Sequence, residues 1–271
     1  MNQEQSTAII IFDIDGVIRD VGNSYRRAIA DTVEEFTGGG WRPTMEDLDN
    51  LKLEGIWNND WEASQELTYR YFESFDKTRE EVSLDYDQIV KYFQERYRGK
   101  HPELFDGYIT NEPLLVTPNY FEQLSNNQIP YGFFSGATRG SAEFVLKQRL
   151  QLENPVLVAM EDAPSKPDPT GMFTAIAQIA NMPKNMPKNM PNNVPAFYLG
   201  DTVADMYTVI RARELQPERN WLGIGILPPH VQTSQTRQED YAQKLLEAGA
   251  EIVLSNVEKL SLQLIEELTD R

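Results

Sequence analysis

The chain contains no cysteine and only two histidines, and acidic residues far outnumber basic ones. The absence of cysteine excludes disulfides, thiol catalysis and cysteine-ligated metals, and it agrees with a reducing cytosol. With 25 Lys and Arg against 42 Asp and Glu, the formal net charge is −17. Such a charge repels the phosphates of nucleic acids and anionic membranes unless a basic patch exists, and the sequence contains none. Nucleic acid and membrane partners are therefore not expected.

The sequence also lacks a long hydrophobic run. Its opening residues, Met-Asn-Gln-Glu-Gln, include no basic residue, and the apolar run that follows is too short for a signal peptide or a membrane span. These features predict a cytoplasmic protein. With 271 residues, 40% of them hydrophobic, the chain can bury a substantial core in one large or two modest domains.

The short apolar run near the N-terminus ends in two carboxylates. Residues 8–12 are typical of a buried strand, and Asp13, Asp15 and Gly16 follow it. The side-chain period of a strand is two, so both carboxylates point to the same face, and the glycine lets the chain turn away. Two close carboxylates repel each other unless a cation lies between them or one takes a proton. The pattern predicts a Mg²⁺ site, although a simple turn can have the same composition.

The next ninety or so residues have the pattern of helices only. Apolar residues recur at helical spacing in four segments, and no strand pattern is present between about residues 20 and 110. The segments are 25–36, 44–53, 62–75 and 85–97. This region predicts an all-helical insertion over residues 21–111.

From residue 118 onward, helix and strand patterns alternate. The expected strands are 131–134, 156–160, 196–199, 221–226 and 252–254. The expected helices are 118–126, 141–150, 170–179, 204–214, 240–247 and 258–268. The alternation predicts an α/β fold, a Rossmann-like parallel sheet with helices on both faces.

One low-complexity segment interrupts this half of the chain. Residues 182–193 repeat the pattern Met-Pro-Lys-Asn. Proline at every fourth position is incompatible with both a helix and a paired strand, so the segment is expected to be an exposed loop without a catalytic role.

Polar residues follow four of the expected strands, and the carboxyl ends of parallel strands share one edge of the sheet. In chain order these groups are Asp13 and Asp15; Ser135, Gly136 and Arg139; Glu161, Asp162 and Lys166; and Gly200, Asp201 and Asp205. Each group alone is common in turns, but their ordered coincidence indicates a functional site. Carboxylates, a hydroxyl, a lysine and glycine amides are expected to converge there.

In this order, the four groups resemble the motifs of the haloacid-dehalogenase-like superfamily: D-x-D-G-V, a serine after the second strand, the lysine of K-P-D-P, and G-D-x-x-x-D. The helical block resembles the cap of the helical-cap branch, and two of its stretches, Ser-Tyr-Arg-Arg and Trp-Asn-Asn-Asp-Trp, resemble a poorly characterised group of phosphatases. The resemblance implies a discontinuous core domain, 1–20 with 112–271, and a cap domain, 21–111.

The resemblance also implies roles for individual residues. Asp13 would be the nucleophile and Asp15 the general acid and base, while Lys166 would balance negative charge. The phosphate group would be bound by Ser135 and Gly136, and Arg139 would be a second cation that reaches it, in addition to Lys166. Mg²⁺ would be held by Asp13, the backbone carbonyl of Asp15, and Asp201, with Asp205 ligating directly or through water.

The predicted cap contains a loop of two tryptophans around three polar residues. Trp57, Asn58, Asn59 and Asp60 are expected to face the substrate if the cap folds over the site, because loops often carry specificity. The tryptophans fit the hydrophobic core of the cap equally well.

These patterns predict a Mg²⁺-dependent phosphatase that hydrolyses a small phosphorylated metabolite, such as a sugar or organic-acid phosphate, through an aspartyl-phosphate. Two alternatives remain open. A phosphomutase of the same fold would be expected to carry a histidine in the first cap helix, where this chain has Tyr25. A non-catalytic phosphate-binding scaffold would need neither Asp13 nor Asp15.

Overall fold

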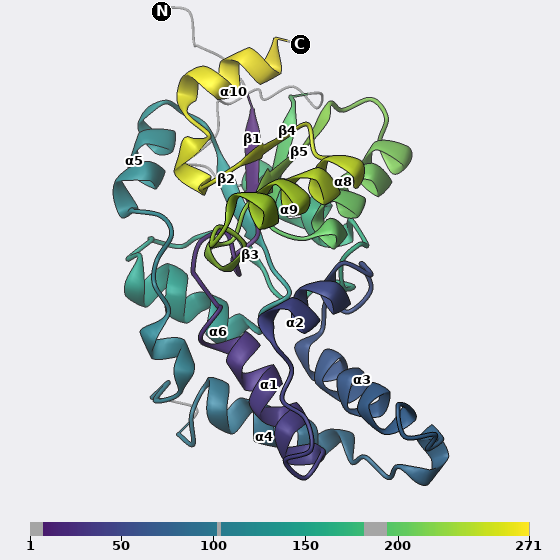
Figure 1. The fold of residues 1–271 in the computed structure, drawn as a ribbon. Helices are drawn as coiled ribbons and strands as arrows, with labels where there is room; N and C mark the ends of the chain where they lie inside the picture. Colours follow the sequence, from purple (N-terminus) through teal and green to yellow (C-terminus); the bar gives the residue numbers. More distant parts are fainter. Residues whose placement is uncertain (1–7, 102–103, 182–193, 271) are drawn as a thin grey trace, which may run out of the picture. The chain divides into compact units, whose positions relative to one another are not determined.

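The computed structural model describes residues 8–101, 104–181 and 194–270, and its fold is drawn in Figure 1. The Met-Pro-Lys-Asn repeat lies outside the described residues. The chain divides into two compact units. The core unit comprises Met1–Asp20 and Leu114–Arg271, and the helical unit comprises Val21–Pro113.

The core unit is built on a parallel sheet with the strand order β3-β2-β1-β4-β5-β6. The strands in the described part of the chain are β1 Ile9–Phe12, β2 Tyr131–Phe134, β3 Leu157–Val158, β4 Ala196–Gly200, β5 Trp221–Ile226 and β6 Ile252–Leu254. Every pairing is parallel, and β1 lies between β2 and β4 (Figure 1). The predicted Rossmann-like α/β fold is confirmed, although β3 is shorter than expected.

The strand β1 is apolar throughout because the sheet is covered on both faces. Alternate side chains enter two separate hydrophobic clusters: Ile10 and Phe12 belong to one, and Ile9 and Ile11 to the other. The first cluster is closed mainly by α5 Pro118–Asn126, α6 Arg139–Glu143 and α10 Leu262–Thr269. The second is closed by α7 Thr170–Ala180 and α8 Val203–Leu215.

Several helix boundaries differ from those expected, for local reasons. The helix expected over residues 141–150 is α6 followed by a π-helical segment, Phe144–Arg149. The helix α9 Gln235–Glu247 begins five residues earlier than expected, because Ser234 caps it by accepting a bond from the Arg237 amide. A single long helix was expected at the C-terminus, but the short helix η5 Val257–Lys259 precedes α10 there, and Ser261 caps α10.

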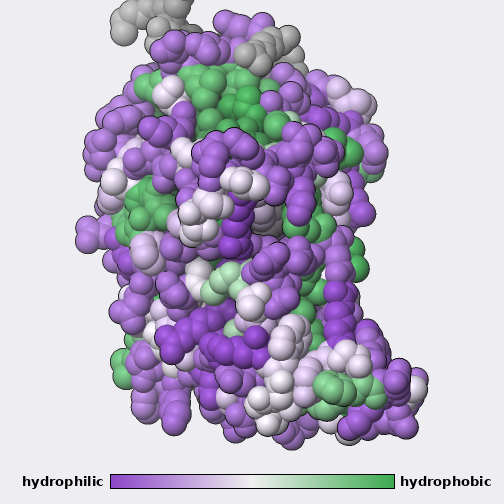
Figure 2. All heavy atoms as spheres, in the orientation of Figure 1, coloured by the Kyte–Doolittle hydropathy of each residue, from purple (hydrophilic) through white to green (hydrophobic). Residues whose placement is uncertain are grey.

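Every regular element in the described part of the helical unit is a helix. The longer ones are α1 Tyr25–Phe36, α2 Met45–Lys52, α3 Asp60–Glu73 and α4 Tyr86–Tyr97, and η1 Arg79–Glu81 and η2 Tyr108–Asn111 are short. The helix α1 packs against both α3 and α4. Hydrophilic residues cover most of the face shown in Figure 2. Of the helices in the described residues, none combines the length and apolarity needed to cross a membrane.

Two adjacent leucines of α9 test how burial sets stability. Leu245 is fully buried and lies against the backbone of β5, where a Cβ on Gly225 would be 3.0 Å from its Cδ1, whereas Leu246 is 42% exposed. We expect Leu245→Ala to lower the free energy of unfolding by about 2–5 kcal/mol, because it leaves a cavity. Leu246→Ala should cost less than about 1 kcal/mol. Urea unfolding monitored by circular dichroism measures both, and equal losses would contradict this packing of α9.

Candidate active site

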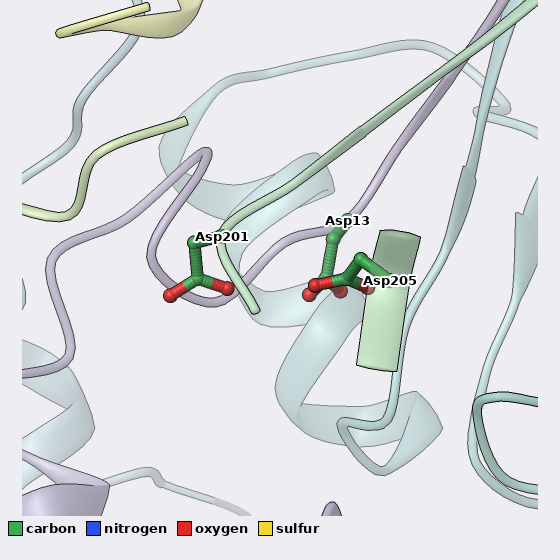
Figure 3. A group of neighbouring side chains, drawn as sticks. All are labelled: Asp13, Asp201 and Asp205. Atoms are coloured by element: carbon green, nitrogen blue, oxygen red, sulfur yellow. The ribbon is translucent and has the colours of Figure 1, made fainter. Parts of the chain in front are cut away.

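Three buried carboxylates meet at the carboxyl edge of the sheet. Asp13 directly follows β1, Asp201 directly follows β4, and Asp205 lies in the first turn of α8. One oxygen from each carboxylate can be chosen so that all three lie within 4.8 Å of one another. Figure 3 shows Asp13 and Asp205 adjacent, with Asp201 beside them. Asp13 and Asp205 are 192 positions apart in the sequence. The structure brings them together, with Asp201, because β1 pairs directly with β4.

Lys166 holds two of these carboxylates. Its Nζ lies 2.8 Å from Asp13 Oδ2 and 2.7 Å from Asp205 Oδ1. The same atom lies 5.5 Å and 5.4 Å from the ring centres of Phe134 and Tyr198, so aromatic faces surround the cation. Burial alone would lower the pKa of Lys166, but the two carboxylates outweigh it and raise this pKa above its ordinary value. The lysine therefore stays charged.

Asp13 has the environment of a poorly solvated carboxyl group. Burial raises its pKa from 3.8 to about 7; the charge of Lys166 opposes this rise, and Asp205 and Asp15 add to it. Its Oδ1 accepts a hydrogen bond of 2.7 Å from the Ile14 amide, and its Oδ2 faces Lys166. Without a further cation, this carboxyl group is partly protonated near neutral pH.

The carboxylate of Asp205 is fully occupied by protein donors. Its Oδ1 accepts from Lys166 Nζ and from the Tyr198 hydroxyl at 3.1 Å, and its Oδ2 accepts from the Thr202 amide at 2.9 Å and the Thr202 hydroxyl at 2.7 Å. A carboxylate has about four lone-pair positions, and all four are used here. This geometry favours a role for Asp205 in holding Lys166 and capping α8. Its predicted role as a metal ligand stays a prediction.

Tyr198 is a member of this cluster that the sequence analysis missed. Its hydroxyl donates to Asp205 Oδ1 and also lies 3.2 Å from the carbonyl of Phe134. Burial and the neighbouring carboxylates raise its pKa well above the ordinary value, so it stays protonated. The sequence did contain a signal for this role. Tyr198 places a hydroxyl in an otherwise apolar, buried strand, and a buried polar atom is costly unless it has a hydrogen-bond partner.

The loop after β1 packs tightly onto Asp201. Gly16 has a φ of +75°, and a Cβ at this position would lie 2.0 Å from Asp201 Oδ2. Only glycine fits, both because of the backbone conformation and because the Asp201 carboxylate occupies the space of a side chain. The backbone carbonyl of Asp201 is held separately, by the Tyr241 hydroxyl at 3.0 Å. The ligand atoms that Asp13 and Asp201 can offer a metal ion are carboxylate oxygens, which suit a hard cation such as Mg²⁺.

Asp15 is more exposed than the other carboxylates. Its side chain is 20% exposed, and its Oδ1 accepts a bond of 2.6 Å from Nε of the fully buried Arg19. It lies two residues beyond Asp13, in the turn that Gly16 continues. A carboxyl group here can reach solvent while one of its oxygens is held in place.

The residues predicted to bind phosphate have different environments. Ser135 is buried at the end of β2, where its Oγ accepts from the Ala137 amide at 3.1 Å. Gly136 is exposed. The guanidinium of Arg139 pairs with Asp162 and lies 3.7 Å from Glu143. Two carboxylates thus engage Arg139, and its phosphate-binding role stays a prediction.

The residues predicted to confer specificity have structural contacts within the helical unit. Asn59 caps α3 by accepting from the amides of Trp61 and Glu62, and Asp60 pairs with Lys52 at 2.7 Å. Trp57 donates its indole N–H to Glu54 at 2.6 Å. Asn58 is half-buried. Substrate recognition by Trp57, Asn58, Asn59 and Asp60 remains a prediction.

The raised pKa of Asp13 gives the metal-free protein a distinctive pH dependence. Between 3.8 and about 7 the folded protein keeps a proton that the unfolded chain releases, so its stability falls as the pH rises through this interval. Asp13→Asn removes the buried charge. In EDTA we expect it to raise the free energy of unfolding at both pH 5 and pH 8, with a gain at least about 1 kcal/mol larger near pH 8, because the cost of the buried carboxyl group grows across this interval.

Urea unfolding at the two pH values tests this expectation. Asp240→Asn, the same substitution at an exposed position of α9, is the control and should change stability at neither pH. An equal gain for Asp13→Asn at both pH values would contradict the raised pKa.

Comparison with known proteins identifies the fold. No protein-family model matches the chain. A relative from Phytophthora nicotianae, described as an imidazoleglycerol-phosphate dehydratase, is 28% identical over 252 residues. The match covers 91% of this chain and 50% of the relative, so the chain spans half the length of that protein.

Three solved structures share the architecture at low sequence identity. A HAD hydrolase of family IA, variant 3, from Entamoeba histolytica has a TM-score of 0.62 at 15% identity and covers 97% of this chain and 100% of its own. Phosphatase Tt82 from Thermococcus thioreducens has a TM-score of 0.57 at 22% identity, covering 80% and 92%. The β-phosphoglucomutase of Clostridium difficile has a TM-score of 0.57 at 14% identity, covering 97% and 96%. The chain therefore has the fold of the haloacid-dehalogenase-like hydrolases.

Proposed function

We propose that this protein is a Mg²⁺-dependent phosphatase that hydrolyses a small phosphate monoester through an aspartyl-phosphate. The observation that carries the proposal is the pairing of the buried Asp13 carboxylate with Lys166 at the end of β1, next to Asp201. A purely structural ion pair would not need a third buried carboxylate beside it, because a further negative charge destabilises the group.

In the first step, an oxygen of Asp13 attacks the phosphorus atom of the ester. A bond forms between this oxygen and phosphorus, and the bond from phosphorus to the ester oxygen breaks. The electron pair of the broken bond stays on the leaving oxygen, which takes the proton of the Asp15 carboxyl group and departs as an alcohol. The product on the enzyme is an aspartyl-phosphate.

In the second step, water attacks the phosphorus atom of this intermediate. The Asp15 carboxylate takes a proton from the water, and the bond between phosphorus and Asp13 breaks. Inorganic phosphate leaves, Asp13 returns as a carboxylate, and Asp15 is protonated again. The same carboxyl group therefore acts as acid and then as base.

Other residues at the same edge would stabilise the transferring group. Lys166 presents a fixed positive charge beside Asp13, and the Ser135 hydroxyl and the Gly136 amide can donate to phosphate oxygens. Asp13, the backbone carbonyl of Asp15, and Asp201 would hold Mg²⁺, and their all-oxygen donor set fits this ion. When bound, Mg²⁺ would supply positive charge that offsets the phosphate and favours ionised Asp13.

The comparisons support hydrolysis or transfer of a phosphoryl group without choosing between them. A phosphatase and a β-phosphoglucomutase match with the same TM-score of 0.57, and a fold alone does not define a reaction. The dehydratase activity named for the Phytophthora relative belongs to a protein twice as long. Its name does include a phosphorylated imidazole compound, so a phosphate ester with an imidazole ring belongs in a substrate panel beside sugar and organic-acid phosphates.

The proposal is tested by phosphate release from such a panel, with Mg²⁺ and with EDTA. We expect release only with Mg²⁺, and a loss of at least about 1000-fold in Asp13→Asn, because no other residue can form the intermediate. Asp240→Asn serves as the matched control and should keep full activity. Release that survives Asp13→Asn would contradict the nucleophile, and transfer of phosphate to a second sugar in place of water would indicate a mutase.

A second test isolates the cation site. Gly16→Ala places a methyl group against Asp201, and we expect Mg²⁺ affinity to fall by at least about tenfold, as measured by calorimetry, because the carboxylate must move. Gly38→Ala is the matched control. Gly38 also has a positive φ, of +65°, but a Cβ there would meet no atom within 4 Å. Both variants carry backbone strain, so equal affinities would contradict a metal site at Asp201.

A further inference from the structure

Arg19 is a fully buried cation in the loop that carries Asp15. Its Nε donates to Asp15 Oδ1 at 2.6 Å, and its Nη2 donates to the hydroxyl of Ser141 at 3.1 Å. Ser141 is itself buried and belongs to α6, 122 residues further along the chain. The guanidinium therefore links the loop after β1 to a helix of the same unit.

The backbone of this loop fixes the distance between the two side chains. The Gly16 amide donates to the Arg19 carbonyl at 2.9 Å, and the Arg19 amide donates to the Ile14 carbonyl at 3.2 Å. Asp15 and Arg19 also form an isolated parallel bridge. With both backbone positions held, the direction of the Asp15 carboxylate depends on the planar guanidinium that binds one of its oxygens.

We propose that Arg19 is a positioning residue for Asp15: it holds Oδ1 so that Oδ2 is presented to the leaving group and then to water. This inference rests on the proposed phosphatase function. A general acid must lie within hydrogen-bond distance of the oxygen it protonates, and an aspartate side chain with both torsions free spends little time there. A lysine at position 19 cannot replace the arginine, because a single Nζ does not reproduce separate bonds from Nε and Nη2.

The experiment compares two classes of substrate in the Mg²⁺-loaded wild type, Arg19→Met and Arg19→Lys. An alkyl phosphate needs a proton on its leaving group, whereas the dinitrophenolate of 2,4-dinitrophenyl phosphate leaves without one. For the alkyl phosphate we expect Arg19→Met to lower kcat about 100-fold, with KM changed less than about threefold. For the dinitrophenyl ester we expect a burst of about one equivalent per enzyme and slow turnover afterwards, because only the second step then needs Asp15.

A double-mutant cycle shows whether Arg19 acts through Asp15. In an Asp15→Asn background, Arg19→Met should change kcat by less than about threefold. A further loss of tenfold or more in that background, or equal losses for both substrates without a burst, would overturn the proposal. Arg19→Lys keeps the buried charge and should still lose kcat for the alkyl phosphate; full activity would also overturn it.

Two further measurements keep the inference separate from folding and from the proposed function. Ser141→Ala removes the hydroxyl that accepts from Arg19 Nη2, and we expect about a three- to tenfold loss of kcat for the alkyl phosphate, again with KM nearly constant. A crystal structure of Arg19→Met should show the Asp15 carboxylate in a different rotamer, and an unchanged rotamer would overturn the inference. An inactive wild type contradicts the proposed function. An active wild type, together with an Arg19→Met variant whose kcat for the alkyl phosphate is unchanged, contradicts only the role of Arg19.

Discussion

The ion pairs of Lys166 with Asp13 and Asp205 are the contacts on which the rest of the site depends. A buried charge is costly unless it is paired and hydrogen-bonded, and here one buried ammonium group satisfies two buried carboxylates. This is possible only if the ends of β1 and β4 lie next to each other and the loop before α7 delivers the lysine to the same place. The strand order, with β1 beside β4, meets the first requirement.

The distribution of hydrogen bonds among the carboxylates divides their roles. Asp205 uses its four lone-pair positions on Lys166, Tyr198 and Thr202, and this geometry favours a supporting role for it. Asp13 and Asp201 are better placed to bind a cation, and Asp13, with its raised pKa, gains most from one. For the proposed phosphate ester to bind here, such positive charge would be needed, because otherwise the carboxylates and the phosphate dianion would repel each other.

The fold alone does not decide the reaction. Hydrolases and a phosphomutase share this architecture with the chain, and they do so at identities below one quarter. The reaction depends on the side chains at the strand ends and on what reaches them. The structure adds two contacts there beyond the expected motifs: the Tyr198 hydroxyl donates to Asp205 Oδ1, and Arg19 Nε donates to Asp15 Oδ1.

The sequence by itself determined the strands and the parallel sheet, because each follows from a local pattern, and it predicted a site at the carboxyl ends of the strands. An apolar run that ends in Asp13 and Asp15 can be recognised without a structure, as can Asp201 directly after a later strand and Lys166 in the loop before a later helix. Only the tertiary structure decided which partners these side chains take. The saturation of Asp205, the hydroxyl of Tyr198 and the bond from Arg19 to Ser141 depend on rotamers and on packing between segments far apart in the chain, and no local pattern specifies those.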